Sequence, residues 1–189
     1  MIRLLVGLGN PGQQYAKTRH NAGFLFLEAL ADELGGVWIN EPKFQGLFSA
    51  CDIAGRKVML LKPETFMNRS GEAVGKIARF YKLAPEEILV IHDDLDFDAG
   101  IVKLKKEGGH AGHNGLKDII AHLGSKDFYR LRIGIGRPAA GRSIVDFVLS
   151  PPSKNERDLI VSSFCLSRSF INEIVTGDIA TVMNKLHAC

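Results

Sequence analysis

A histidine with polar neighbours stands at the start of a long apolar segment. The stretch "TRHNAG" (18–23) places Arg19, His20 and Asn21 directly before "FLFLEALADEL". One interpretation is a polar loop in which the asparagine caps a helix. The other is that His20 faces a cleft and acts as a general base, because imidazole changes its protonation near neutral pH. A lone histidine before a helix is usually a surface residue, so this stretch needs support from the rest of the chain.

A carboxylate beside His20 would supply that support. One ring nitrogen of a neutral imidazole must be held as a donor if the other is to accept a proton. The segment "IHDDLDFD" brings four aspartates directly after an apolar run, and Asp93 is the one nearest the end of that run. We therefore expect Asp93 to be held rigidly, to fix the tautomer of His20 and to stabilise its imidazolium form. The aspartates that follow are typical of a solvated turn.

Amide side chains recur in the polar loops. Asn10 lies in "GNPG", Asn68 in "FMN" and Asn114 in "HNG". The "GLGNPG" stretch matches neither a dinucleotide-binding nor a P-loop pattern, and Pro11 disfavours a helix at Asn10, so a tight turn is the simpler interpretation. Asn114 precedes a helical pattern and is also a candidate helix N-cap.

Histidines and aspartates in two of these loops also suggest a metal site. The candidate ligands are His92, Asp93, Asp94, His110 and His113. The H-x-x-H spacing lacks the i, i+4 geometry that places two histidines on one face of a helix, and the glycines around it would hold ligands poorly. We therefore expect no metal and no cofactor.

Basic residues alternate along two expected strands. Lys103 and Lys105 in "VKLKK" project from the same face of a strand, and Arg130 and Arg132 in "YRLRIG" repeat the spacing. This pattern is compatible with an ordinary exposed face. It is equally compatible with a site that binds phosphate groups.

These residues require a scaffold, and the chain predicts one in which strands alternate with helices. Such alternation favours an α/β fold with a mixed, mostly parallel sheet flanked by helices, in which ligands bind beyond the carboxyl ends of the strands. The loops at 9–23, 64–71, 92–100 and 107–115 would meet there. The expected strands span 2–8, 57–63, 87–93, 101–106 and 128–136. The expected helices span 23–36, 70–84 with Ser70 as cap, 114–124, a segment after "SPPS" and 178–187.

Composition restricts the class of protein. With 189 residues and 46% hydrophobic residues, we expect one domain over 1–189. A net charge of +3 is too small to indicate a nucleic-acid partner by itself. The cysteines Cys51, Cys165 and Cys189 form no paired framework. The short apolar run at 2–8 is not typical of a signal peptide, and no apolar stretch is long enough for a membrane span, so we expect neither. We expect a cytoplasmic protein with no membrane association.

Together the motifs resemble bacterial-type peptidyl-tRNA hydrolases over nearly the whole chain. The matching pieces are "VGLGNPG", "TRHNAG", "KPETFMNRSGEAV", "ILVIHDDLD", "GHNGLKDI", "FYRLRIGIGRP" and "VDFVLSPP". The resemblance implies a single phosphorylase/hydrolase-like α/β domain that cleaves the ester between a peptide and the 3′ end of tRNA, without a metal. Family members are usually monomers. A non-catalytic RNA-binding relative and a metal-dependent hydrolase are the alternatives.

The resemblance also assigns roles to residues. It implies that His20 is the catalytic base, Asp93 its orienting carboxylate and Asn10 a further catalytic group. Contacts with the substrate are implied for Tyr15, Phe66, Asn68 and Asn114, and contacts with the tRNA 5′-phosphate for Lys103, Lys105 and Arg132. The usual "HGGHNG" of the family is "HAGHNG" here, so Ala111 would be strained if that position takes a positive φ.

Overall fold

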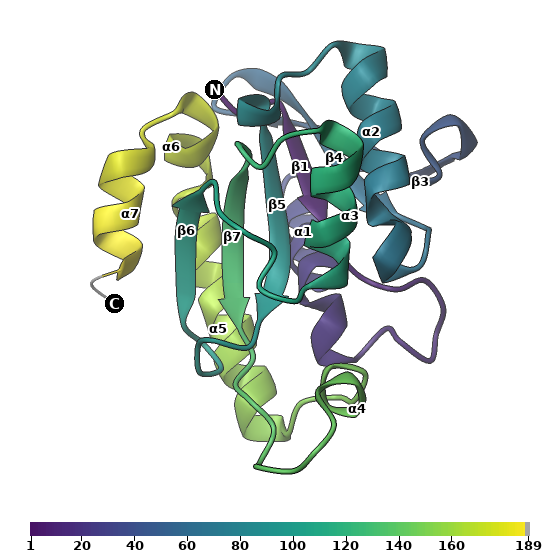
Figure 1. The fold of residues 1–189 in the computed structure, drawn as a ribbon. Helices are drawn as coiled ribbons and strands as arrows, with labels where there is room; N and C mark the ends of the chain where they lie inside the picture. Colours follow the sequence, from purple (N-terminus) through teal and green to yellow (C-terminus); the bar gives the residue numbers. More distant parts are fainter. Residues whose placement is uncertain (188–189) are drawn as a thin grey trace.

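A mixed sheet forms the centre of the computed structural model, which describes residues 1–187 (Figure 1). Its strand order is β2-β3-β4-β1-β5-β7-β6. Strands β4, β1, β5 and β7 are parallel. At one side β3 pairs antiparallel with β4 and β2 antiparallel with β3, and at the other side β6 pairs antiparallel with β7. The bounds are β1 Leu4–Gly7, β2 Ile39–Glu41, β3 Gly46–Ile53, β4 Arg56–Pro63, β5 Ile88–Asp94, β6 Val102–Lys106 and β7 Tyr129–Gly134.

Helices cover both faces of the sheet. In Figure 1, α2 and α3 lie in front of the sheet, α1 and α5 behind it, and α6 and α7 beside the β6 edge. Helix α4 lies beyond the end toward which β5 and β7 point. The bounds are α1 Ala22–Glu33, α2 Ser70–Tyr81, α3 Asn114–Leu123, α4 Ile144–Val148, α5 Lys154–Arg168, α6 Ile171–Thr176 and α7 Ile179–His187. Short 3₁₀ turns are η1 Arg19–Asn21, η2 Pro42–Phe44, η3 Met67–Arg69 and η4 Pro85–Glu87.

The central strands are apolar on both faces because helices cover both. On β1, Leu5 packs into the core on the α1 side, whereas Leu4 and Val6 pack into the core on the α2 side. Strand β5 repeats the division, with Ile91 in the first cluster and Val90 in the second. This explains why these strands read as continuous apolar runs in the sequence.

Two glycines let α1 begin directly against the sheet. A Cβ on Gly23 would lie 2.3 Å from the carbonyl oxygen of Ile91, and one on Gly7 would lie 2.3 Å from the carbonyl oxygen of Gly23. No other residue fits at these positions without moving backbone. The close approach holds the preceding turn η1, which contains His20, at the carboxyl ends of β1 and β5.

The expected fold class is confirmed: the chain is a single-domain α/β protein with a mostly parallel, mixed sheet. The expected strands and main helices are present with shifted ends. Strands β2 and β3 and the short helices α4 and α6 were not predicted. The β3–β4 hairpin turns at Ala54 and Gly55, both with positive φ. Alanine at the first position of such a turn lacks the usual Asn-Gly or Asp-Gly signal.

Both expected helix caps were wrong. Ser70 is the first residue of α2, and its hydroxyl donates to the carbonyl of Met67 instead of accepting from the helix. His113, one residue before Asn114, caps α3 by accepting the backbone N–H of Leu116. Among the described helices, none is long and apolar enough to cross a membrane. Cys189 lies outside the described residues.

Candidate active site

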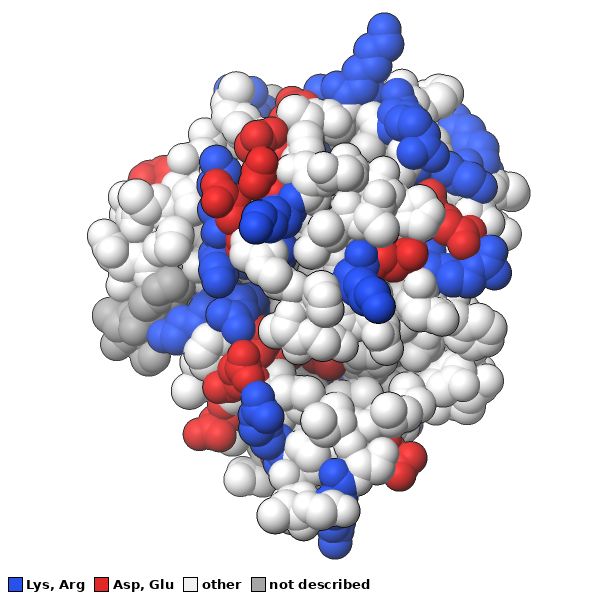
Figure 2. Space-filling view, in the orientation of Figure 1, with Lys and Arg blue, Asp and Glu red and all other residues white. Residues whose placement is uncertain are grey.

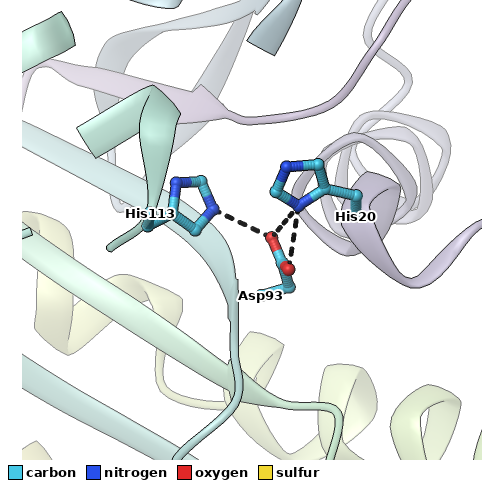
Figure 3. Close-up of side chains that lie close together, drawn as sticks. All are labelled: His20, Asp93 and His113. Atoms are coloured by element: carbon cyan, nitrogen blue, oxygen red, sulfur yellow. Dashed lines mark hydrogen bonds and ion pairs between the residues drawn. The ribbon is translucent and has the colours of Figure 1, made fainter. Parts of the chain in front are cut away.

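His20 and Asp93 come together from different elements. Nδ1 of His20, in η1, lies 2.9 Å and 3.0 Å from the two carboxylate oxygens of Asp93, near the end of β5. Because a carboxylate only accepts, Nδ1 carries the proton. Nε2 is then the unprotonated nitrogen, and it points away from Asp93 (Figure 3). His20 lines a cavity of about 570 Å³.

A second histidine binds the same carboxylate from the other side. Nε2 of His113 lies 2.9 Å from Oδ1 of Asp93 (Figure 3). Nδ1 of His113 accepts the N–H of Leu116 at 3.3 Å, so its proton is on Nε2 and is donated to Asp93. Asp93 is 3% exposed, and its buried carboxylate accepts one N–H from each imidazole. Sequence reasoning considered His113 only as a metal ligand. Its spacing from His20 and Asp93 gave no sign of this contact.

The electrostatics of the pair favour imidazolium. Burial acts to lower the pKa of His20, but the charge and hydrogen bond of Asp93 outweigh it, and the pKa is raised above its usual value. Burial acts to raise the pKa of Asp93, but the two histidines lower it well below the usual carboxylate range. Asp93 therefore remains ionised at neutral pH and stabilises a proton on His20.

His92 is a third, different histidine in this region. Its side chain is 2% exposed, and Nδ1 donates to the backbone carbonyl of Asp93 at 2.7 Å. Burial, followed by the proximity of His113, lowers the pKa of His92 to about 3. His92 is therefore neutral under ordinary conditions and packs edge-on against the ring of His113.

Two hydrogen bonds join the side chain of Asn21 to the backbone of Asn10. The side chain of Asn21 accepts the N–H of Asn10 at 2.9 Å and donates to its carbonyl at 3.0 Å. Oδ1 of Asn10 accepts the N–H of Met67 at 2.7 Å, which leaves its amide nitrogen on the other side of the group. Asn21 thus supports the loop of Asn10 and does not cap α1 with its side chain. Sequence reasoning missed this role, since contacts with a distant backbone leave no periodic signal.

The other predicted substrate residues are distributed around the site. Asn114 is exposed and lines the same cavity as His20. Phe66 is 57% exposed and lines a second, smaller pocket. Asn68 is exposed in η3, and Tyr15 is half-buried in the turn that precedes η1. Among the predicted site residues, the lining of the cavity at His20 does not include Asn10, Tyr15, Phe66, Asn68 or Lys103.

The predicted basic residues share one face of the β6–β7 pair. Lys103 lies opposite Arg132, and Lys105 lies opposite Arg130. Figure 2 shows Lys and Arg side chains on this part of the surface with acidic side chains beside them. Lys105, Arg130 and Arg132 line the same cavity as His20.

Two of these cations have roles that the sequence did not indicate. Nε of Arg132 donates to Asp94 at 2.7 Å. Arg130 is 3% exposed and donates to the carbonyls of Gly108 and Gly109, so it holds the glycine loop before α3. Ala111 in that loop has φ 47°, so the expected strain is present. A left-handed conformation costs about 1 kcal/mol for a residue with a Cβ.

One group in the described residues has metal-ligand character. Potential ligand atoms of His20, Asp93 and His113 lie within 4.8 Å of one another. To bind a metal through Nε2, His113 would have to move its proton to Nδ1, which accepts from Leu116. The hydrogen bonds therefore favour a hydrogen-bonded imidazole–carboxylate–imidazole group over a coordination site. This set differs from the metal ligands considered from the sequence.

An imidazole oriented by a buried carboxylate at the mouth of a cleft is compatible with general-base catalysis. A family model described as peptidyl-tRNA hydrolase matches residues 4–189. The chain belongs to the peptidyl-tRNA hydrolase family.

Relatives and solved structures match this chain over almost its full length. The chain is 52% identical to the peptidyl-tRNA hydrolase of Methylococcus capsulatus over 187 residues, covering 99% of this chain and all of the relative. It is 52% identical to that of Coxiella burnetii, covering 99% and 98%. The crystal structure of peptidyl-tRNA hydrolase from Acinetobacter baumannii superposes with a TM-score of 0.95 at 46% identity, covering 98% of this chain and 94% of that chain. The protein is thus an enzyme that hydrolyses peptidyl-tRNA.

Proposed function

We propose that His20 is the general base of this hydrolysis. The observation that carries the proposal is the contact between Nδ1 of His20 and the carboxylate of Asp93, which leaves Nε2 to accept a proton. In this mechanism Nε2 removes a proton from water as the water oxygen attacks the ester carbonyl carbon. The resulting imidazolium gives that proton to the 3′ oxygen of the ribose as the ester bond breaks. The products are a peptide with a free carboxylate and tRNA with a free 3′ hydroxyl.

Asn10 is our candidate for recognition of the reacting end of the peptide. Its oxygen is occupied by the N–H of Met67, so the amide nitrogen is the group it can offer to a substrate carbonyl or to the developing oxyanion. An amide suits this task because it donates without titrating. Asn68 is a second candidate donor to the substrate carbonyl or the oxyanion, and Asn114 is proposed to position water or the terminal ribose. Tyr15 and Phe66 are proposed to contact the substrate through their rings.

The basic face is proposed to bind the 5′-phosphate of the tRNA. Lys103, Lys105 and Arg132 lie on one face of β6–β7. A terminal phosphate carries more charge than an internal phosphodiester, so a compact group of cations favours it. Asp94 holds the Nε side of the guanidinium of Arg132, and Asp96 lies 3.6 Å from Nη2, so two carboxylates fix its orientation. These contacts would orient Arg132 before the substrate arrives.

The remaining expectations stand as parts of the same proposal. Residues 1–189 act as one domain and as a monomer in the cytoplasm, where charged tRNA is present. No metal or cofactor takes part, because an oriented imidazole and amide donors supply proton transfer and charge stabilisation.

The test compares two substrates. Purified protein is incubated with N-acetyl-aminoacyl-tRNA and with unblocked aminoacyl-tRNA carrying the same amino acid, and released tRNA is measured. We expect rapid hydrolysis of the blocked ester and slow hydrolysis of the free one. Asn10→Ala should narrow this difference, because the amide that recognises the first peptide bond is lost. Equal rates on both esters with the wild-type protein would contradict the proposed specificity.

A chelator provides the control for the metal-dependent alternative. Hydrolysis should continue at an unchanged rate after dialysis against EDTA. Loss of activity that added zinc or magnesium restores would favour the alternative.

A further inference from the structure

Arg19, the residue before His20, is buried and makes an unusual number of contacts. It is 8% exposed. Its Nη1 atom lies within hydrogen-bond distance of the carbonyls of Phe147, Ser150 and Pro151 and of the hydroxyl of Ser150, at 2.7 to 3.3 Å. These acceptors lie at the end of α4 and in the segment that follows it. A guanidinium is suited to this place because it has several donors in one plane and its charge complements the carboxyl end of a helix.

The same guanidinium also reaches the start of α5. Nη2 of Arg19 lies 3.0 Å from Oε2 of Glu156. Glu156 forms a capping box with Ser153, accepting the Ser153 N–H at 2.7 Å. Burial acts to raise the pKa of Glu156, but its hydrogen bonds with Ser153 and the charge of Arg19 lower it. The carboxylate is thus ionised and binds Nη2 of Arg19, while the acceptors of the α4 segment bind Nη1.

Two more contacts join Arg19 to this segment, and we call the full set of contacts between Arg19 and residues 147–156 the anchor. The guanidinium carbon of Arg19 lies 4.1 Å from the centre of the Phe147 ring, and the backbone N–H of Arg19 donates to the carbonyl of Ser150 at 3.1 Å. Both the side chain and the backbone of Arg19 therefore bind one segment, residues 147–156. His20 is the next residue in η1, so the same turn carries the proposed base and this anchor.

The anchored helix forms part of the cleft. Ile144, Val145 and Val148 of α4 line the cavity that His20, Asn114 and Lys105 also line. Ile144 and Val145 are 50% and 62% exposed, so solvent or a ligand can reach them. Because α4 has only five residues, its position depends on contacts from outside the helix.

We propose that Arg19 is a positioning residue that sets the α4 wall of the cleft at a fixed distance from His20. The role rests on the proposed function of His20 but concerns a different property, the shape of the space in which the substrate lies between the base and the basic face. Arg19 acts through α4 and not through the proton chemistry of His20, which Asp93 controls. The family resemblance assigned no role to this residue.

The variant Arg19→Gln removes the anchor and keeps a polar side chain. We expect KM for peptidyl-tRNA to rise so that kcat/KM falls on the order of 10-fold, with kcat and the pH dependence changing little. The matched control is Arg168→Gln. Arg168 forms a comparable contact, with Nε 2.7 Å from Glu33, but on the α1–α5 side of the sheet, and its replacement should leave the kinetics unchanged. Glu156→Gln keeps the capping box and removes one partner of Arg19, so it should give a smaller change in the same direction.

A double-mutant cycle distinguishes action through α4 from general destabilisation. Val145→Ser alters the exposed wall without removing a buried group, and it should also raise KM. If Arg19 acts through this wall, adding Val145→Ser to the Arg19→Gln variant should raise KM by less than about a further 2-fold. Effects that multiply fully, an unchanged KM in folded Arg19→Gln, or a shifted pH profile would each overturn the inference. These results presuppose that the wild-type protein hydrolyses peptidyl-tRNA, so failure of the proposed function would be seen separately, in the wild type itself. If Arg19→Gln does not fold, the same cycle is measured with Glu156→Gln.

Discussion

His20 and His113 lie on either side of a single carboxylate, with their ring centres 5.1 Å apart. Each donates one N–H to Asp93, and their tautomers are set by different partners. His20 keeps a free Nε2, whereas the Nδ1 of His113 is occupied by the N–H of Leu116. The two rings are therefore not equivalent: only His20 has a basic nitrogen available to a substrate.

His113 is predicted to position Asp93 and thereby His20. His113→Asn keeps a strong helix N-cap residue for α3 but is too short to make the contact with Asp93. We expect kcat to fall roughly 10-fold, by analogy with outer hydrogen bonds that orient other functional groups, while the melting temperature stays near that of the wild type. His113→Ala, which also loses the cap, should lose stability as well. An unchanged kcat in His113→Asn would contradict the role.

The Asp93 carboxylate should control the acid limb of the pH profile. Because it raises the pKa of His20, kcat/KM of the wild type should decline as the pH falls through a value above the usual 6.5 of imidazole. Asp93→Asn removes the charge that raises the pKa of His20, so the acid limb of the kcat/KM profile should move to lower pH. The maximal rate should fall by about 10²- to 10⁴-fold, since the amide also permits the wrong tautomer.

Asp94→Asn is the matched control for this measurement. Asp94 binds Arg132 and not His20, so its replacement should leave the acid limb in place. A shifted limb in Asp94→Asn, with a normal one in Asp93→Asn, would mean that the wrong neighbour was chosen.

The basic face should contribute affinity that depends on salt. Lys105 faces the cavity and Lys106, the next residue on β6, projects from the opposite face. Lys105→Ala should raise KM for intact substrate and reduce the slope of log affinity against log salt by about one unit. Lys106→Ala should do neither. A minimal ester without the 5′-phosphate should be cleaved equally by all three proteins, and equal losses on both substrates would assign Lys105 to the fold or the catalytic centre.

His92 should make the fold sensitive to acid. Its folded-state pKa of about 3 lies below the ordinary 6.5 of an unfolded chain, so between these values the unfolded state binds the extra proton. The free energy of unfolding should therefore lose up to about 1.4 kcal/mol per pH unit from this residue as the pH falls below 6.5. His92→Leu removes the effect. Urea unfolding of the wild type and of His92→Leu is measured at pH 7, 6 and 5. The free energy of unfolding of the variant, relative to that of the wild type, should increase as the pH falls. A difference between the two proteins that stays constant with pH would contradict this role of His92.

The sequence was most informative where a residue type and its position in a regular element coincide. The apolar run before Asp93 predicted a buried strand whose end holds a rigid carboxylate, and β5 has this form. Alternating Lys103 and Lys105 predicted a shared face, which the pairing of β6 with β7 bears out. The first inference needs only the continuous apolar run of a strand buried on both faces, and the second only the alternation of side chains along a strand.

The rest depends on tertiary contacts that leave no periodic trace. Asn21 supports the backbone of Asn10, and Arg19 binds a segment more than a hundred residues away. Neither partner is implied by its neighbours in sequence. The assignment of Ser70 as a cap was wrong for a different, local reason: the preceding residues form η3, and the hydroxyl of Ser70 donates to the carbonyl of Met67 three residues earlier.

The most direct test of the central claim is single-turnover hydrolysis of N-acetyl-aminoacyl-tRNA by His20→Asn. His20 is 12% exposed at the edge of a cleft, so the variant should keep its fold and its affinity for tRNA. Circular dichroism and a binding assay with uncharged tRNA would establish both. The account predicts a rate about 10²- to 10⁴-fold below that of the wild type on the pH plateau of the wild type, with the acid limb abolished. A folded, tRNA-binding His20→Asn protein that cleaves the ester at a near-normal rate would contradict it.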